Sequence, residues 1–134
     1  MKNENRILFK SERQDWGTPK GLYRKLNKEF DFDFDPCPDG DPRLLPDGLD
    51  IEWGQSNFCN PPYNQIRNWV EKGYKEHKKG KTVVFLIPSR TCTKWWHDYI
   101  MKANEIRFIK GRLKFEGAKY NAPFPSCIVV FRKD

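Results

Sequence analysis

Residues 82–87, TVVFLI, form an unbroken apolar run in a chain that is otherwise rich in charge. A strand with one solvated face alternates apolar and polar residues, whereas a strand buried on both faces does not. No stretch of about 18 apolar residues occurs, so the sequence predicts no membrane-spanning helix. We therefore predict a central strand at residues 82–87 with helices packed on both faces of its sheet.

Helical spacing of apolar residues predicts three helices around this strand, over residues 18–30, 64–77 and 93–100. The expected N-caps are Thr18, Asn64 and Thr93, because their side chains can accept hydrogen bonds from the first N–H groups of a helix. Further strands are predicted at residues 31–35, 57–59, 105–109 and 126–132, with a possible short strand at 111–115.

Helices separate the early strands, while the last strands follow one another without a helix. Parallel neighbours need a crossover, and strands joined by a loop can pair antiparallel. The sequence thus predicts an α/β three-layer sandwich with a mainly parallel sheet and an antiparallel strand near the C-terminus. With 134 residues we expect a single domain, over residues 15–134, preceded by a polar arm at 1–14.

The stretch Asn60-Pro61-Pro62-Tyr63 directly follows the predicted strand 57–59. Two prolines there can simply end the strand, with Asn60 as a turn residue and Tyr63 as a surface ring. Alternatively, the amide oxygen of Asn60 and the carbonyl of Pro61 accept both hydrogens of an exocyclic amine, and Tyr63 stacks on the ring that carries it. A nucleic-acid base bound in this way must leave the duplex.

Charge is compatible with a polyanionic partner. Lys and Arg number 25 against 18 Asp and Glu, which gives a net charge of +7. Such an excess occurs on ordinary surfaces, and it also suits DNA, because neutralised phosphates release counterions. The four cysteines form no CxxC pair, so we expect no metal site and reduced, mostly buried thiols in a cytoplasmic protein; they are Cys37, Cys59, Cys92 and Cys127.

Several stretches together resemble a known family. NPPY after a strand is similar to the catalytic motif of methyltransferases that act on exocyclic nitrogens of DNA bases, and it also occurs in enzymes that methylate protein glutamine. The sequence further contains, in order, DWGTPKGLYRKL, FDFDPCP, DGLDIEWGQSNFCNPPY, IPSRTCTKWWHD, IRFIKGRLKF and APFPSCIVVF. As a set these motifs resemble the phage-type DNA N6-adenine methyltransferase family, over roughly residues 15 to 132.

The resemblance implies a Rossmann-like fold, reduced in size, of the S-adenosylmethionine-dependent methyltransferase type. It implies transfer of the methyl group of this cofactor to adenine N6, in DNA that we expect to be double-stranded, in the cytoplasm of a bacterium or of a phage-infected host. The catalytic positions of the family fall on Asn60, Pro61, Pro62 and Tyr63.

Cofactor binding is implied for three further segments. Trp16, Thr18 and Pro19 match a segment that closes over the methionine end, and the turn Asp35-Pro36-Cys37 follows the first strand. Asp47, or alternatively Asp50, falls where a carboxylate contacts the adenine of the cofactor, and we favour Asp47. Asn60 completes the predicted cofactor set.

DNA contacts are expected from Tyr63, Arg90, Arg112 and Lys114, the last two within a basic cluster that also contains Arg107, Lys110 and Lys119. A solvated face is an equal alternative for the cluster. The sequence contains no separate target-recognition domain, so we expect either short, weak specificity or recognition that depends on a second copy or a partner subunit.

The chain departs from larger methyltransferases between Pro36 and the strand before Asn60. About 20 residues cannot hold two strand–helix units, since one βαβ unit takes about 30. This leaves open a DNA-binding protein that keeps the fold with little turnover. Cytosine N4 remains an alternative target, and protein glutamine is disfavoured by the basic charge and the C-terminal motifs.

Overall fold

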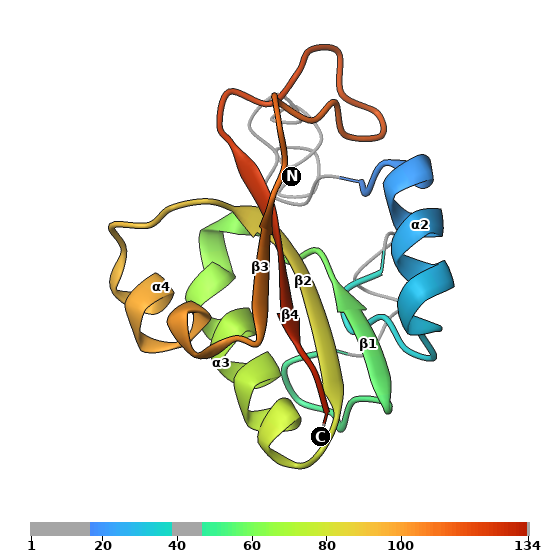
Figure 1. Cartoon of the computed structure of the whole chain (residues 1–134), viewed down its shortest axis with the longest axis vertical. Coiled ribbons are helices and arrows are strands. Elements are labelled where there is room, and N and C mark those ends of the chain that lie inside the picture. The colour runs from blue at the N-terminus through green and yellow to red at the C-terminus, as the bar shows by residue number, and fades with distance from the viewer. Residues whose placement is uncertain (1–16, 39–46, 134) are drawn as a thin grey trace, which may run out of the picture.

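The computed structural model of the chain describes residues 17–38 and 47–133 (Figure 1). Four strands form one open sheet in the order β1-β2-β4-β3, namely β1 (Ser56–Cys59), β2 (Thr82–Pro88), β4 (Ser126–Phe131) and β3 (Glu105–Phe108). β1 is parallel to β2, and β4 is antiparallel to both of its neighbours.

The expected α/β class and the antiparallel strand near the C-terminus are confirmed, whereas the expected mainly parallel pairing is wrong. The sheet is mixed, because β4 enters between β2 and β3 and makes two of the three neighbouring pairs antiparallel. β3 runs in the same direction as β1 and β2. Only β4, which follows β3 without a helix between them, runs in the opposite direction.

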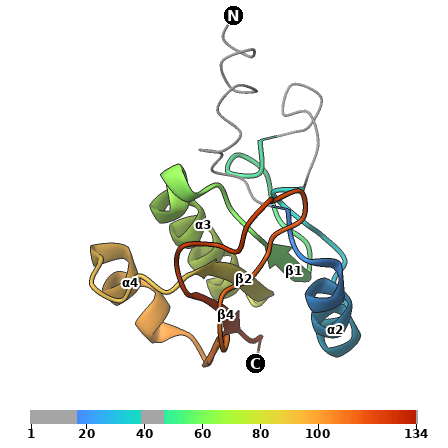
Figure 2. The ribbon, with the colours of Figure 1, turned by 90° about the horizontal axis from the view of Figure 1, so that it is seen from above.

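Every residue of β2 is buried, as the apolar run predicts. Val83, Phe85 and Ile87 belong to one apolar cluster, which includes residues of α3 (Ile66–Lys78) and α4 (Lys94–Asp98). Val84 and Leu86 belong to a second cluster, which includes residues of α2 (Lys20–Phe30). Figure 2 shows α2 on the opposite side of the sheet from α3 and α4, so helices cover both faces.

Only one of the three expected helix caps forms. The Thr93 hydroxyl accepts the Trp96 N–H at the start of α4, which confirms that prediction. Thr18 does not cap α2, because the helix begins at Lys20 and its N-cap is Pro19; the Thr18 hydroxyl accepts a hydrogen bond from Asn60. Asn64 lies inside the 3-10 turn η2 (Tyr63–Gln65), so α3 begins at Ile66 without a side-chain cap.

The predicted strand at 31–35 is reduced to a single parallel bridge between Phe34 and Asn57. Asp31 ends α2 in the left-handed region with φ 51. The exposed Asp33 carboxylate accepts the N–H groups of Gln55 and Ser56 at 3.1 Å each. The Asp33 side chain thus accepts backbone N–H groups that the backbone carbonyls of a longer strand would otherwise accept.

Three other segments complete the described structure. The β3–β4 loop (residues 109–125) contains no strand at 111–115, although the Ala122 N–H donates to the Leu113 carbonyl at 2.7 Å. A second 3-10 turn, η3 (Ile100–Lys102), precedes β3. Residues 36–38 and 47–55 contain no helix or strand, so the described part of this short segment holds no additional strand–helix unit.

Two further findings concern only the described residues. No helix among them has the length and apolar character required to cross a bilayer. No three or more His, Cys, Asp or Glu side chains in these ranges lie together where they could bind a metal ion. The predicted arm at 1–14 lies outside the described residues.

Candidate active site

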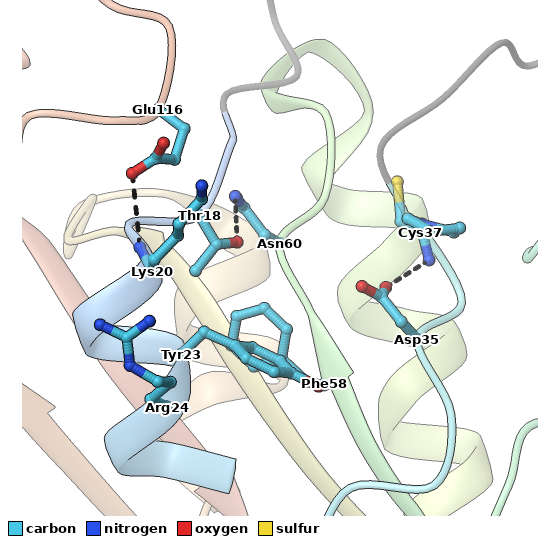
Figure 3. Close-up of a pocket in the computed structure, with 10 residues that line it drawn as sticks. Thr18, Lys20, Tyr23, Arg24, Asp35, Cys37, Phe58, Asn60 and Glu116 are labelled. Atoms are coloured by element: carbon cyan, nitrogen blue, oxygen red, sulfur yellow. Dashed lines mark hydrogen bonds between the residues drawn. The ribbon is translucent and has the colours of Figure 1, made fainter.

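A cavity of about 490 Å³ lies where β1 ends, between the start of α2 and the turn at residues 35–38 (Figure 3). Four residues predicted from the sequence line it: Thr18, Asp35, Cys37 and Asn60. Three separate segments therefore bring the predicted residues together. Six lining residues were not predicted: Lys20, Tyr23, Arg24, Pro38, Phe58 and Glu116.

Asn60 lies directly after β1 and is 7% exposed. Its Nδ2 atom donates to Thr18 Oγ1 at 3.0 Å, which connects the strand end to the residue before Pro19 (Figure 3). Pro61 is buried and Pro62 has an extended backbone before the η2 turn, so the two prolines lead the chain away from the sheet at a fixed angle.

The turn after Phe34 is closed by Asp35, whose Oδ1 atom accepts the Cys37 N–H at 2.9 Å. Pro36 is buried within it. Gly48 lies so close that a Cβ atom at this position would be 2.0 Å from the Pro36 carbonyl oxygen. A glycine is therefore required where the backbone of residues 47–50 approaches the turn.

Both signs of charge line the cavity. Lys20 and Arg24 lie one helical turn apart at the start of α2, while Asp35 and Glu116 supply carboxylates. The spacing of Lys20 and Arg24 after the Thr18-Pro19 pair could have suggested their position. No local pattern could have indicated Glu116, which comes from the β3–β4 loop, 96 residues from Lys20.

Tyr63 is partly buried beside the β3–β4 loop and does not line the cavity. Its ring makes edge contacts with Phe115 and Phe124, at centroid distances of 6.4 and 5.2 Å. The Tyr63 hydroxyl is buried and has no hydrogen-bond partner among the described residues. Burial is the main cause that raises the pKa of Tyr63, so the phenol stays neutral at pH 7.

The other predicted residues that the structure describes do not line the cavity. Asp47 is exposed, and its Oδ1 atom accepts the Leu49 N–H at 3.0 Å. Trp16 lies outside the described residues. The cavity lining also excludes the remaining predicted residues, which are Pro19, Pro36, Pro61, Pro62, Arg90, Arg112 and Lys114. Of these, Arg90, Arg112 and Lys114 are exposed.

Cys59, next to Asn60, is fully buried, and this burial raises its pKa well above the usual value of a thiol. A neutral, inaccessible thiol is a poor nucleophile. Among the cysteines, Cys59 and Cys127 are buried, Cys37 is partly buried and Cys92 is exposed. The buried amide of Asn60, and not the adjacent sulfur, is therefore the functional group that β1 presents to the cavity.

Comparison with known proteins gives one match. The family model for DNA N-6-adenine-methyltransferase (Dam) matches residues 6–132. Neither the curated proteins nor the solved structures gave a match. The family match confirms the resemblance seen in the motifs, and it supports DNA adenine methyltransferase activity in general. Since the match extends over nearly the whole sequence, the chain belongs to the DNA N-6-adenine-methyltransferase (Dam) family.

Proposed function

We propose that the protein transfers a methyl group from S-adenosylmethionine to the N6 atom of adenine in double-stranded DNA. The observation that carries the proposal is the position of Asn60 in NPPY, buried at the cavity and hydrogen-bonded to Thr18 at 3.0 Å. The Rossmann-like, three-layer arrangement of methyltransferases is part of the proposal, and helices on both sheet faces support it.

The cavity residues fit this cofactor chemically. Its methionine end carries a carboxylate and an ammonium group, which suit Lys20 or Arg24 and Asp35 respectively. Tyr23 and Phe58 offer apolar ring surface for its adenine. A volume of about 490 Å³ is within the usual range for small-molecule sites. When bound, S-adenosylmethionine supplies an electrophilic methyl group attached to a sulfonium.

The task of Asn60 and Pro61 is to hold the amino group of the base. Conjugation with the ring makes an exocyclic nitrogen a weak nucleophile. If the Asn60 Oδ1 atom and the Pro61 carbonyl accept its two hydrogens, the lone pair is localised on the nitrogen instead of being delocalised into the ring. Positive charge develops on that nitrogen during transfer, so the same two acceptors stabilise the transition state more than the ground state.

Tyr63 is proposed to hold the adenine after it leaves the duplex. Flipping costs a few kcal/mol, and aromatic stacking offsets part of that cost. Phe115 and Phe124 already contact the Tyr63 ring, so the β3–β4 loop completes an aromatic wall next to NPPY. The buried, neutral hydroxyl of Tyr63 is not assigned a role in proton transfer.

The test uses the full chain with isotopically labelled S-adenosylmethionine, adenine-containing duplexes and a protein substrate. Nucleoside mass spectrometry of the digested DNA should show N6-methyladenine. Asn60→Ala should lower kcat by roughly 100-fold or more, the cost of losing one preorganised transition-state hydrogen bond. Asn64→Ala is the matched control, because Asn64 is exposed and lies four residues further along the chain.

Label in N4-methylcytosine or in protein would contradict the proposed substrate. No label in any substrate, from protein that binds DNA, would indicate a binding protein instead. Turnover by Asn60→Ala at the wild-type rate would show that NPPY only ends a strand.

A further inference from the structure

We propose that Thr18 is a positioning residue for Asn60, and that its hydroxyl holds the Asn60 side chain in place at the cavity. The inference rests on the proposed function, because the position of this side chain matters only if Asn60 binds an amine. Thr18 was expected from the sequence only as part of a cofactor-binding segment and as a helix cap.

A hydrogen bond between the two side chains anchors the Asn60 amide at the cavity. Asn60 Nδ2 donates to Thr18 Oγ1 at 3.0 Å, and Asn60 is 7% exposed. With Nδ2 at Thr18, the planar amide turns its Oδ1 atom to the opposite side. A threonine hydroxyl can also donate, so it can bond either end of the amide, and the amine of the base selects the orientation with Oδ1 facing it. The reverse orientation would present an NH2 group to the amine of the base, which is a contact between two donors.

Thr18 can act in this way because its own backbone is held on both sides. Before it, the Gly17 carbonyl accepts the Glu116 N–H at 2.8 Å. After it, the Lys20 N–H donates to the Glu116 carboxylate at 3.4 Å. Glu116 therefore connects the β3–β4 loop to Gly17 and Lys20, which flank the Thr18-Pro19 pair, and the hydroxyl is presented to Asn60 from a backbone that is held on both sides.

Thr18 also lines the cavity, so loss of its hydroxyl could act through the cofactor alone. The two explanations predict different kinetics. A cofactor contact changes the KM for S-adenosylmethionine and acts whatever residue occupies position 60. A positioning role changes kcat and disappears when Asn60 is absent.

The experiment compares Thr18→Val, Thr18→Ser, Asn60→Ala and the double variant Thr18→Val/Asn60→Ala, with an adenine-containing duplex and saturating S-adenosylmethionine. Valine keeps the shape and removes the hydroxyl, while serine keeps the hydroxyl. We expect Thr18→Val to lower kcat by about 10- to 100-fold, the scale of a small misplacement of a catalytic group. Thr18→Ser should restore most of kcat, and Thr18→Val should cause no further loss in the Asn60→Ala protein.

A second readout needs neither cofactor nor DNA. In 15N-resolved NMR spectra of the folded protein, hydrogen exchange at the Asn60 side-chain amide should be faster by roughly tenfold in Thr18→Val than in wild type or Thr18→Ser. Unchanged exchange, wild-type kcat in Thr18→Val, or equal losses with and without Asn60 would overturn the inference. If the wild type makes no N6-methyladenine while the exchange result holds, the proposed function fails and the side-chain contact stands.

Discussion

The carboxylate of Asp35 closes a turn and also lines the cavity. One oxygen accepts the Cys37 N–H at 2.9 Å and closes the turn after Phe34. The side chain also lines the cavity, opposite the cations at the start of α2. A variant that removes the whole carboxylate would therefore confuse loss of the turn with loss of charge. Asparagine separates the two, since it keeps an oxygen acceptor for the Cys37 N–H.

We expect Asp35→Asn to weaken S-adenosylmethionine binding by roughly 10- to 100-fold, because a hydrogen bond to a charged group contributes about 1.5–3 kcal/mol. Isothermal titration calorimetry of the full chain measures this affinity directly. Asp31→Asn is the control, since Asp31 is exposed, does not line the cavity and has a positive φ that asparagine tolerates. Equal affinity in Asp35→Asn and wild type would exclude an electrostatic role for Asp35.

At the scale of elements, a buried group of charges fastens α3 to the start of β2. Lys81 is 4% exposed, and its ammonium group donates to the Glu76 carboxylate, to Glu52, and to the Trp53 carbonyl at 2.8 Å. Glu76 is 1% exposed and also accepts the Trp53 N–H at 3.2 Å. Burial alone would raise the pKa of Glu76, but hydrogen bonds from three lysines lower it to about 2.

Glu76→Gln should lower the free energy of unfolding at pH 7 by about 3 kcal/mol, because it leaves the Lys81 charge buried beside a neutral partner. The folded-state pKa lies below the ordinary 4.5, so this contribution is present above about pH 4.5 and is lost as the pH falls toward 2. The difference between wild type and variant should therefore shrink over that interval. Urea denaturation at several pH values measures it.

The matched control is Glu71→Gln, five residues earlier on α3. Glu71 forms an ion pair with Lys75 at 3.5 Å, a largely exposed i,i+4 pair, and such pairs contribute about 0.5 kcal/mol or less. If Glu76→Gln is no less stable than this control, or if the difference persists unchanged at pH 2, the charge group does not stabilise the fold.

The elements that the sequence predicted well are those that a local pattern determines. The apolar run predicts β2. Thr93 caps α4 by accepting the N–H of Trp96, only three residues away. The errors arise where a distant partner competes for the same atom. The hydroxyl of Thr18 bonds to Asn60, 42 residues away, and the Asp33 carboxylate accepts N–H groups 22 and 23 residues away.

The same distinction applies to the site. Motifs identified Thr18, Asp35, Cys37 and Asn60 as members of one set, and the structure brings them to one cavity. Their roles remain predictions. Glu116 could not be predicted, since its contacts with Gly17 and Lys20 depend on how the β3–β4 loop folds back over the start of α2.

At the scale of the whole molecule, the net charge of +7 does not mean that every basic side chain is available to bind DNA. Arg107, expected in the basic cluster, donates twice to Glu29 at 2.7 Å and also to Glu105, so its charge is compensated. Four basic residues of the β3–β4 loop are exposed and form no ion pair with any described residue: Lys110, Arg112, Lys114 and Lys119. This loop therefore offers positive charge next to Tyr63.

We expect DNA affinity to fall steeply with salt, and the double variant Arg112→Gln/Lys114→Gln to reduce the slope of log K against log salt by about 2, since each neutralised phosphate contributes about 0.9. Fluorescence anisotropy with a labelled duplex between about 50 and 200 mM salt measures the slope. Lys75→Gln on α3 is the control and should leave it unchanged. A slope that is the same in the double variant and wild type would remove these two side chains from the DNA interface.

The buried charges around Lys81 and the amide of Asn60 occupy opposite ends of the parallel pair β1–β2, since Lys81 precedes β2 and Asn60 follows β1. At about 3.3 Å per residue, the two ends are roughly 16 Å apart. Folding stability and turnover can therefore respond separately to mutation. Buried ion pairs are often replaceable by apolar residues without loss of stability. For laboratory evolution, this makes the Lys81 end a place to accumulate thermostabilising changes while the geometry around Asn60 is conserved.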